Sequence, residues 1–369
     1  MNRPRWPMGL LGAVAIIVAA ELFVARHWVD FTGSHALSWT LSEQAAGREA
    51  RTARVLCFGD SLMKHGLLPD VLGPRLGTTV TNLSATAAQA PTSFYLLKRS
   101  LDAGARPEAI IVDFMPDLLA GGLPDAARQW PELLTFAETV ELARSGRDFT
   151  FLVRTTIDRG IRSRRSRPEI RAGVSSALRG EVNPIRVTNL TLSRNWTLHG
   201  GAQFSQDNPG FDGQATSNAH DRPMSDRFWC NGVNRDYLDK FFNLARSRGI
   251  PVYWVLPPAS PALQLRREAG GGDASYTAFV RDVVSRHPGA VVLDARQSGF
   301  DHTRFVDPIH LSGKGAIALS TAVADAISSR RMAWIDLPSC PDRPLPVPLE
   351  DLEQSRVVVL SQRSSRDRR

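Results

Sequence analysis

Short apolar runs alternate with amphipathic stretches in two separate parts of the chain, residues 53–115 and 234–330. Short apolar runs that end at turn residues are typical of buried parallel strands, and apolar positions three and four apart are typical of covering helices. The pattern predicts five strands, at residues 54–58, 79–83, 109–114, 252–256 and 290–293. It also predicts helices at residues 92–103, 234–247, 275–286 and 312–328. We therefore expect an α/β fold.

The alternation stops between about residues 116 and 230, where the pattern is helical and irregular and contains no clear strand. We interpret this part as an insertion in the α/β domain. Residues 144–171 contain nine arginines and three acidic residues, densest at Arg162–Arg167. These arginines are expected either to hold an acidic glycan or anionic lipid headgroups, or to form a solvated basic face.

The first 30 residues have the pattern of a membrane anchor or a signal peptide. Arg3 and Arg5 precede an apolar run from about Met8 to Val24, which only Glu21 interrupts. Basic residues at the amino end keep that end in the cytoplasm. We favour a permanent single-pass transmembrane helix, because the apolar run is long for a signal; cleavage after Ala19 and Ala20 is the alternative. Both place the rest of the chain outside the cytoplasm, as a membrane protein or, after cleavage, a secreted one.

The remaining segments complete the expected domain organisation. Residues 31–52 are polar with weak periodicity and indicate a linker, and residues 53–330 form the α/β domain with its insertion. Five prolines between residues 338 and 348 exclude a helix there, so residues 331–369 are expected to form a Pro-rich and then Arg-rich tail.

Composition excludes several classes of function. The formal net charge of +8 favours an anionic partner or surface. Nucleic acid is not expected as a partner, because the apolar N-terminal segment places the arginine cluster outside the cytoplasm and no aromatic-interleaved basic face is visible. The three cysteines form no CxxC pair and indicate no metal site, although Cys230 and Cys340 remain a possible disulfide. No Gly-rich phosphate loop is present, so we expect no cofactor. The oligomeric state stays open.

Two short motifs carry residues suited to nucleophilic catalysis. Ser61 directly follows the first predicted strand, in Phe-Gly-Asp-Ser-Leu at residues 58–62. A serine hydroxyl needs a base, and the base needs a group that orients it. Late in the chain, Asp307-Pro-Ile-His310 offers a histidine as base, with an aspartate three residues earlier to hold its tautomer. A plain helix-capping serine is the alternative for Ser61.

In these two blocks the chain resembles the SGNH/GDSL hydrolases. The resemblance covers about residues 53–115 and 234–330. It implies a flavodoxin-like three-layer sandwich with a five-stranded parallel sheet of order 2-1-3-4-5. It also implies that Ser61 is the nucleophile, His310 the base and Asp307 its partner.

The middle blocks depart from that family's pattern. Ala87, in Asn82-Leu-Ser-Ala-Thr-Ala87, stands where the family has a glycine that donates to the oxyanion, and a backbone donor survives this change. Pro116, in Asp113-Phe-Met-Pro116-Asp117, stands where the family has an asparagine donor, and proline has neither an amide side chain nor an N–H. The candidate oxyanion and substrate-binding residues are then Ser61, Ala87, Asp60 and Asp117.

The sequence thus predicts a serine-dependent acyl-ester hydrolase or O-acyltransferase. The anchor and the insertion are similar to those of membrane-anchored relatives that move acetyl groups onto polysaccharides, so we expect acylated carbohydrate, or lipid, as the substrate. The triad does not separate hydrolysis from transfer, since both pass through an acyl-Ser61 intermediate. The alternative is a non-catalytic binding or assembly module of a cell-envelope polysaccharide system, which the missing asparagine favours.

Overall fold

The computed structural model describes residues 8–126, 128–214, 224, 227–329 and 333–337. Its centre is a parallel sheet of six strands in the order β2-β1-β3-β4-β5-β6. The strands are β1 (Val55–Phe58), β2 (Val80–Asn82), β3 (Ala109–Val112), β4 (Val252–Leu256), β5 (Ala290–Asp294) and β6 (Trp334–Asp336). The predicted α/β class and the order of the first five strands are confirmed. The sixth strand was not expected: β6 lies in the predicted tail and pairs with β5.

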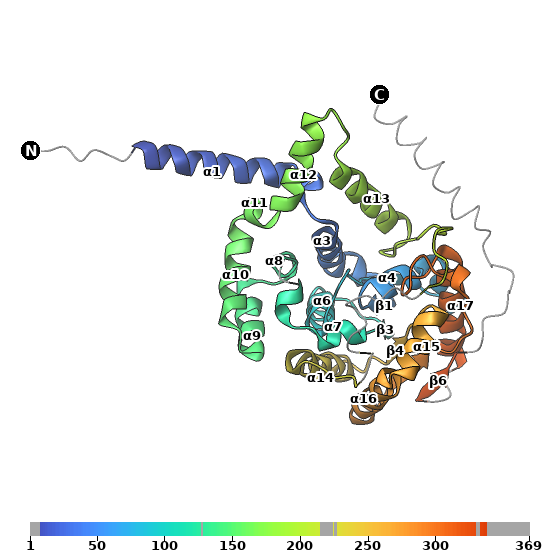
Figure 1. The fold of residues 1–369 in the computed structure, drawn as a ribbon. Helices are drawn as coiled ribbons and strands as arrows, with labels where there is room; N and C mark the ends of the chain where they lie inside the picture. The colour runs from blue at the N-terminus through green and yellow to red at the C-terminus, as the bar shows by residue number, and fades with distance from the viewer. Residues whose placement is uncertain (1–7, 127, 215–223, 225–226, 330–332, 338–369) are drawn as a thin grey trace, which may run out of the picture.

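Helices cover both faces of the sheet, because alternate side chains of each buried strand point to opposite sides. Leu56 and Phe58 of β1 pack into the larger apolar core, whereas Val55 and Cys57 pack into the smaller one. The larger core is closed by α6 (Ala90–Asp102), α14 (Gly232–Ser247) and α16 (Gly272–Arg286). The smaller core is closed by α4 (Ser61–Gly66), α5 (Pro69–Leu76) and α17 (Gly313–Ser329). The layers are therefore helix, sheet and helix (Figure 1).

Residues 31–52 are a helix and not the linker that their weak periodicity indicated. Most of this segment forms α3 (Ser34–Gly47), followed by η1 (Glu49–Arg51). Leu37, Trp39 and Ala46 of α3 are fully buried, and the Trp39 ring meets Trp130 of the insertion edge-on at a centroid distance of 4.8 Å. Polar residues on the other side of α3 conceal this apolar face in the sequence pattern.

The insertion between β3 and α14 is helical, as predicted. It consists of α7 (Pro116–Ala120), η2 (Leu123–Ala126), α8 (Trp130–Leu133), α9 (Phe136–Gly146), α10 (Phe149–Gly160), α11 (Arg162–Arg165), α12 (Arg167–Leu178) and α13 (Pro184–Leu198). Several of its arginines pair with acidic residues: Arg165 binds Glu132 at 2.5 Å, and Arg164 binds Asp158. A role for the remaining basic residues in anion binding stays a prediction.

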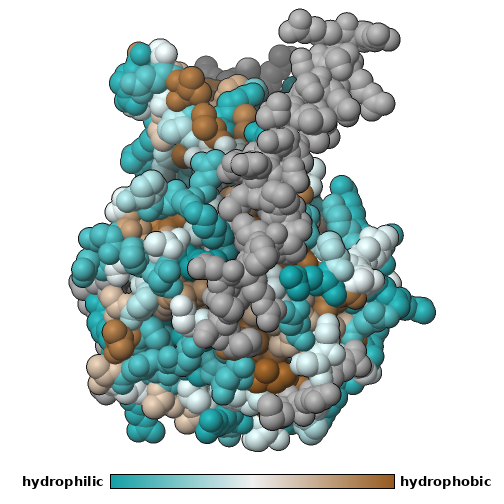
Figure 2. Space-filling view, turned by 90° about the vertical axis from the view of Figure 1, so that its right-hand side faces the viewer, coloured by the Kyte–Doolittle hydropathy of each residue, from teal (hydrophilic) through white to brown (hydrophobic). Residues whose placement is uncertain are grey.

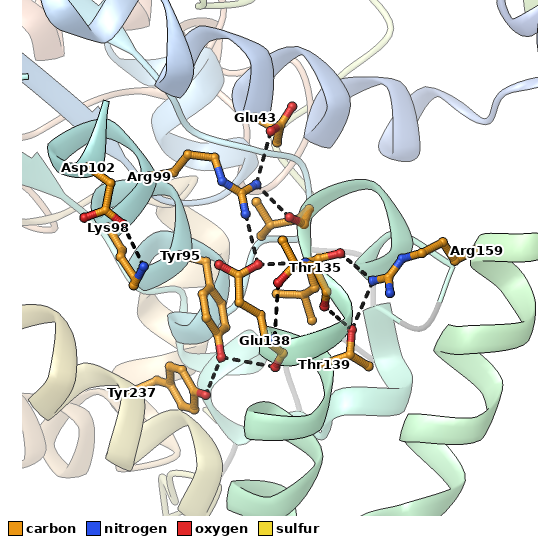
Figure 3. Close-up of polar contacts among 12 residues, drawn as sticks. Glu43, Tyr95, Lys98, Arg99, Asp102, Thr135, Glu138, Thr139, Arg159 and Tyr237 are labelled. Atoms are coloured by element: carbon orange, nitrogen blue, oxygen red, sulfur yellow. Dashed lines mark hydrogen bonds and ion pairs between the residues drawn. The ribbon is translucent and has the colours of Figure 1, made fainter. Parts of the chain in front are cut away.

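A polar network attaches the insertion to the core (Figure 3). Arg99 of α6 donates to Glu43 of α3 at 3.2 Å and to Glu138 of α9 at 3.0 Å. The hydroxyls of Tyr95 on α6 and Tyr237 on α14 are 2.7 Å apart. These side chains come from α3, α6, α9 and α14. The network therefore fixes α9 of the insertion relative to the helices that cover the sheet.

The apolar N-terminal run forms α1 (Met8–Arg26), which extends from the body and leads into the short α2 (Trp28–Phe31) (Figure 1). In the part of the chain that the structure describes, no helix combines the length and the apolar character needed to cross a membrane. The structure thus does not show the transmembrane helix that the sequence predicted.

Three further elements complete the description: α15 (Pro261–Ala269), η4 (His302–Arg304) and a connection of residues 199–214 without regular structure. We call this connection the strap. It leaves α13 and lies against the ends of β2 and α4, where Gly200 accepts a hydrogen bond from the amide of Asn82 at 2.8 Å. Residues 338–369 of the predicted Pro-rich and Arg-rich tail, which include Cys340, lie outside the described residues, and Cys230 is half-buried. Figure 2 shows exposed apolar side chains among polar ones on the body of the molecule.

Candidate active site

Ser61 lies at the carboxyl end of β1, where the connections that follow β1 and its neighbour β3 leave in opposite directions, to β2 and to β4. Such a point is where open α/β sheets bind ligands. The turn before Ser61 requires glycine, because Gly59 has a φ of +138° and a Cβ there would lie 1.8 Å from an oxygen of Asp113. Asp60 then caps α4 by accepting from the amide of Leu62 at 2.7 Å. Ser61 is thus the first residue of α4.

His310 lies in a tight loop that an antiparallel bridge between Phe305 and Leu311 closes. One carboxylate oxygen of Asp307 accepts from the amides of Ile309 and His310, at 2.9 and 2.8 Å. The other oxygen is 2.7 Å from Nδ1 of His310. The spacing of three residues thus places the carboxylate beside the imidazole in a loop rather than on a helix.

The two predicted blocks meet at the serine. His310 Nε2 is 2.9 Å from Ser61 Oγ, although the two residues are 249 positions apart. Since Nδ1 faces a carboxylate, it carries the proton, and Nε2 accepts from the serine hydroxyl. Burial raises the pKa of Asp307, but the hydrogen bonds from His310 and from two amides outweigh it and leave the pKa below its usual value. Asp307 is therefore ionised at neutral pH, as a partner of an imidazolium must be.

Ser61 and Ala87 both line the pocket, and each carries a backbone amide. Ala87 has a φ of +56°, a left-handed conformation that places its N–H in a turn after β2, and it lines the same pocket as Ser61. Neither the Ala87 amide nor the Ser61 amide has an acceptor among the residues described here. Pro116 is buried at the start of α7 and offers no donor. The geometry therefore leaves two amides as candidates for an oxyanion hole.

Asp60 and Asp113 form a buried pair behind the nucleophile. Asp113 accepts from the amide of Asp60 at 3.1 Å, and each carboxyl has one buried oxygen without a described partner. Burial raises the pKa of Asp60 to about 6. Burial and the charge of Asp60 raise the pKa of Asp113 well above its usual range. Asp60 thus supports the turn and does not border the pocket, whereas Asp117, the other acidic candidate, does border it.

The pocket over Ser61 has a volume of about 700 Å³. Its lining combines the triad, apolar side chains and other polar side chains, and comes from six separate segments of the chain. Apart from the triad these include His35, His65, Ala87, Met115, Asp117, Leu118, Asn208, Phe211, Asp212 and Gln214. A pocket of this size accepts a ligand larger than an acetyl group.

The sequence interpretation missed the strap and His65. The strap carries five of the lining residues, between Asn208 and Gln214, and lies within the segment interpreted as an insertion. His65 had a detectable signal, because it lies four residues after Ser61 and thus on the same face of a helix. The strap had none, since only its hydrogen bonds across the fold place it at the pocket.

No group of three or more possible metal-ligating side chains occurs among the described residues. Neither a scan against models of known protein families nor a search of curated proteins returned a match for this chain. The interpretation of the site therefore depends on its own geometry.

Proposed function

We propose that this chain is a serine-dependent acyl-ester enzyme of the SGNH type. It would act as an esterase or O-acyltransferase on acylated carbohydrate outside the cytoplasm. The observation that carries the proposal is the hydrogen-bonded series from Ser61 through His310 to Asp307 at the mouth of a pocket. A nucleophile, a base within reach of it and a group that orients the base are the parts that acyl transfer requires.

In this mechanism, Ser61 Oγ attacks the ester carbonyl while its proton passes to His310 Nε2. Asp307 holds Nδ1 of the imidazole and stabilises the imidazolium that forms. The amides of Ser61 and Ala87 receive the charge on the carbonyl oxygen. His310 then gives the proton to the departing alcohol oxygen, which leaves an acyl group on Ser61. Water or a second alcohol reverses these steps and releases the acyl group.

The lining of the pocket supports an ester of a polar alcohol. Met115 and Leu118 provide apolar surface of the kind that an acyl chain contacts. Asp117, Asn208 and Asp212 provide the polar groups that hydroxyls bind. The combination suits an acylated carbohydrate better than a fully apolar lipid ester.

The extracytoplasmic location rests on the sequence alone. Arg3 and Arg5 precede an apolar run, and this order directs the following chain across a membrane. Protease protection of the chain in intact cells tests it. Degradation of the α/β domain by added protease is expected, and full protection in intact cells with degradation after lysis would contradict this location.

The second candidate is a binding or assembly module that keeps the fold without turnover. The observation in its favour is Pro116, which removes one oxyanion donor. Loss of one such donor costs about 10²–10³ in rate in other enzymes.

Labelling with a fluorophosphonate probe separates the two candidates. The full 369-residue chain is expected to become labelled, and Ser61→Ala and His310→Ala are expected to abolish labelling. Ser145→Ala, which changes a half-buried serine of α9 far from the pocket lining, serves as the control and should label like the native chain. Absence of labelling in the folded native chain would reject the enzyme and favour the binding module.

A further inference from the structure

His65, the histidine of α4, borders the pocket but is not part of the triad. We propose that His65 and the strap form the binding site for the alcohol part of the ester, and that this alcohol is a polyhydroxylated sugar. This inference rests on the proposed function and names the part of the site that recognises the alcohol.

His65 lies one helical turn after Ser61 and beside the base. Its ring meets the ring of His310 edge-on, with the two centroids 5.3 Å apart. Its Nδ1 is 2.8 Å from the hydroxyl of Ser205 on the strap. Its Nε2 has no hydrogen-bond partner among the described residues, and the side chain lines the pocket. One nitrogen is thus held by the protein while the other remains available to a ligand.

The protonation state of His65 suits binding and does not suit a second base. Burial, with the nearby charges of His310 and Lys64, lowers the pKa of His65 to about 3. The imidazole is therefore neutral at the pH where the triad works and does not compete with His310 for the serine proton. Because the Ser205 hydroxyl can donate or accept, the Nε2 atom can serve a sugar hydroxyl in either role.

The direction of the reaction places the alcohol on this side of the pocket. The carbonyl oxygen must point to the amides of Ser61 and Ala87, and the departing oxygen must lie at Nε2 of His310. The rest of the alcohol then extends along the His310 side, where His65 and the strap border the pocket.

The strap presents groups that bind sugars and is held in place. Phe211 offers an aromatic face, and Asn208 and Asp212 offer polar side chains. Asn208 is oriented by donating to the carbonyl of Val306 at 2.8 Å. Two backbone hydrogen bonds fix the strap near Ser205, from Gln203 to Lys64 and from Gly313 to Ser205, each 2.8 Å long. A fixed set of polar groups discriminates against ligands that leave it unpaired.

The test compares two acetyl esters on the full 369-residue chain. 4-Nitrophenyl acetate has an activated aryl alcohol, and an O-acetylated methyl glucoside has a sugar alcohol. The quantity measured is kcat/KM for the glucoside divided by kcat/KM for the aryl ester. We expect His65→Phe, which keeps a ring against His310, to lower this ratio at least tenfold. His65→Gln, which keeps a polar group near Nε2, should recover part of it.

Ser205→Ala should lower the same ratio less than His65→Phe, because the ring keeps its packing. His27→Phe changes an exposed histidine between α1 and α2 and should keep the native ratio. An unchanged ratio in His65→Phe would overturn the inference. So would a native enzyme that cleaves ethyl acetate as well as the glucoside. In both cases fluorophosphonate labelling of Ser61 would leave the proposed function intact, whereas no labelling would remove the function itself.

Discussion

The nucleophile turn and the strap border the same pocket but are held by different means. The turn, residues 59–61, follows a fully buried strand and rests on the buried carboxyls of Asp60 and Asp113. The strap is joined to the core by separate backbone and side-chain hydrogen bonds to α4, β2 and the start of α17. In the proposed function, the turn carries groups that any acyl-ester reaction needs, and the strap carries groups that we propose to recognise one class of substrate. Changes at the turn should affect all esters, whereas changes at the strap should affect selectivity or stability.

The largest effect is expected at the group that orients the base. In Asp307→Asn the amide can donate to Nδ1, which places the imidazole proton on Nε2, where it blocks acceptance from Ser61. An equivalent change at a buried aspartate costs about 10⁴ in kcat. Because the Asp307 side chain is 44% exposed, we expect a loss of about 10²–10³. Hydrolysis of 4-nitrophenyl acetate measures it.

Asp301→Asn, at another capping aspartate six residues earlier, should leave that rate near the native value. A loss of less than tenfold in Asp307→Asn would show that the carboxylate does not set the tautomer.

A substitution in the strap should lower stability most where the strap passes close to β2. Gly201 has a φ of +98°, and a Cβ there would lie 1.9 Å from the carbonyl oxygen of Asn82. Gly201→Ala should therefore lower the free energy of unfolding by about 3 kcal/mol, from backbone strain and from the clash. Urea unfolding followed by circular dichroism measures this change.

Gly104→Ala is the matched control, because Gly104 has a φ of +97° and no atom within 4 Å of its Cβ position. Gly104→Ala should lower the free energy of unfolding only by the part due to backbone strain, about 1 kcal/mol. Equal losses at the two glycines would show that the strap can move away from β2.

Lys64 joins the two regions and should make stability depend on pH. This fully buried side chain of α4 donates to the carbonyls of Ser84 and Gly201, at 2.7 and 3.4 Å. Burial lowers its pKa well below the usual value. Between the folded and unfolded pKa values the unfolded chain binds one more proton, so stability rises with pH by up to about 1.4 kcal/mol per pH unit.

Lys64→Met should remove this contribution. Urea unfolding of the native chain and the variant between pH 6 and 9 measures this contribution. The free energy of unfolding of the native chain should increase relative to that of the variant as the pH rises. Lys98→Met, at an exposed lysine paired with Asp102, is the control and should show a nearly constant difference. A constant difference for Lys64→Met would mean that Lys64 keeps its ordinary pKa in the fold.

The smallest effect is expected at Ala87. Its left-handed backbone is strained for alanine, and glycine adopts it without cost. Ala87→Gly should raise the free energy of unfolding by less than about 1 kcal/mol, because the unfolded chain also gains entropy. Ala88→Gly, at a buried neighbour without a positive φ, should lower it. Thermal unfolding of both variants measures these changes. A lower free energy of unfolding in both would show that the left-handed backbone at position 87 does not strain the folded chain.

Much of the core was predictable because its signals are local. In the runs before Ser61 and around residues 109–114, the side chains that point to either face of the strand are apolar. Only a strand that is covered on both faces requires this pattern. The helix of residues 34–47 was missed because tertiary contacts of Trp39 and Leu37 bury it, while its exposed positions dominate the pattern. The edge strand β6 was missed because three residues beside a Pro-rich segment carry too little pattern.

The sequence by itself determined which residues could perform the proposed chemistry and where along the chain they lie. Ser61, Asp307 and His310 are recognisable because a nucleophile and its base must occupy turns, and turns leave short local motifs. Only the tertiary structure decided that these motifs meet, that Asp60 faces the core, and that the strap places Ser205 against His65. The first and the last of these contacts join residues 249 and 140 positions apart, and their geometry depends on how the whole chain packs.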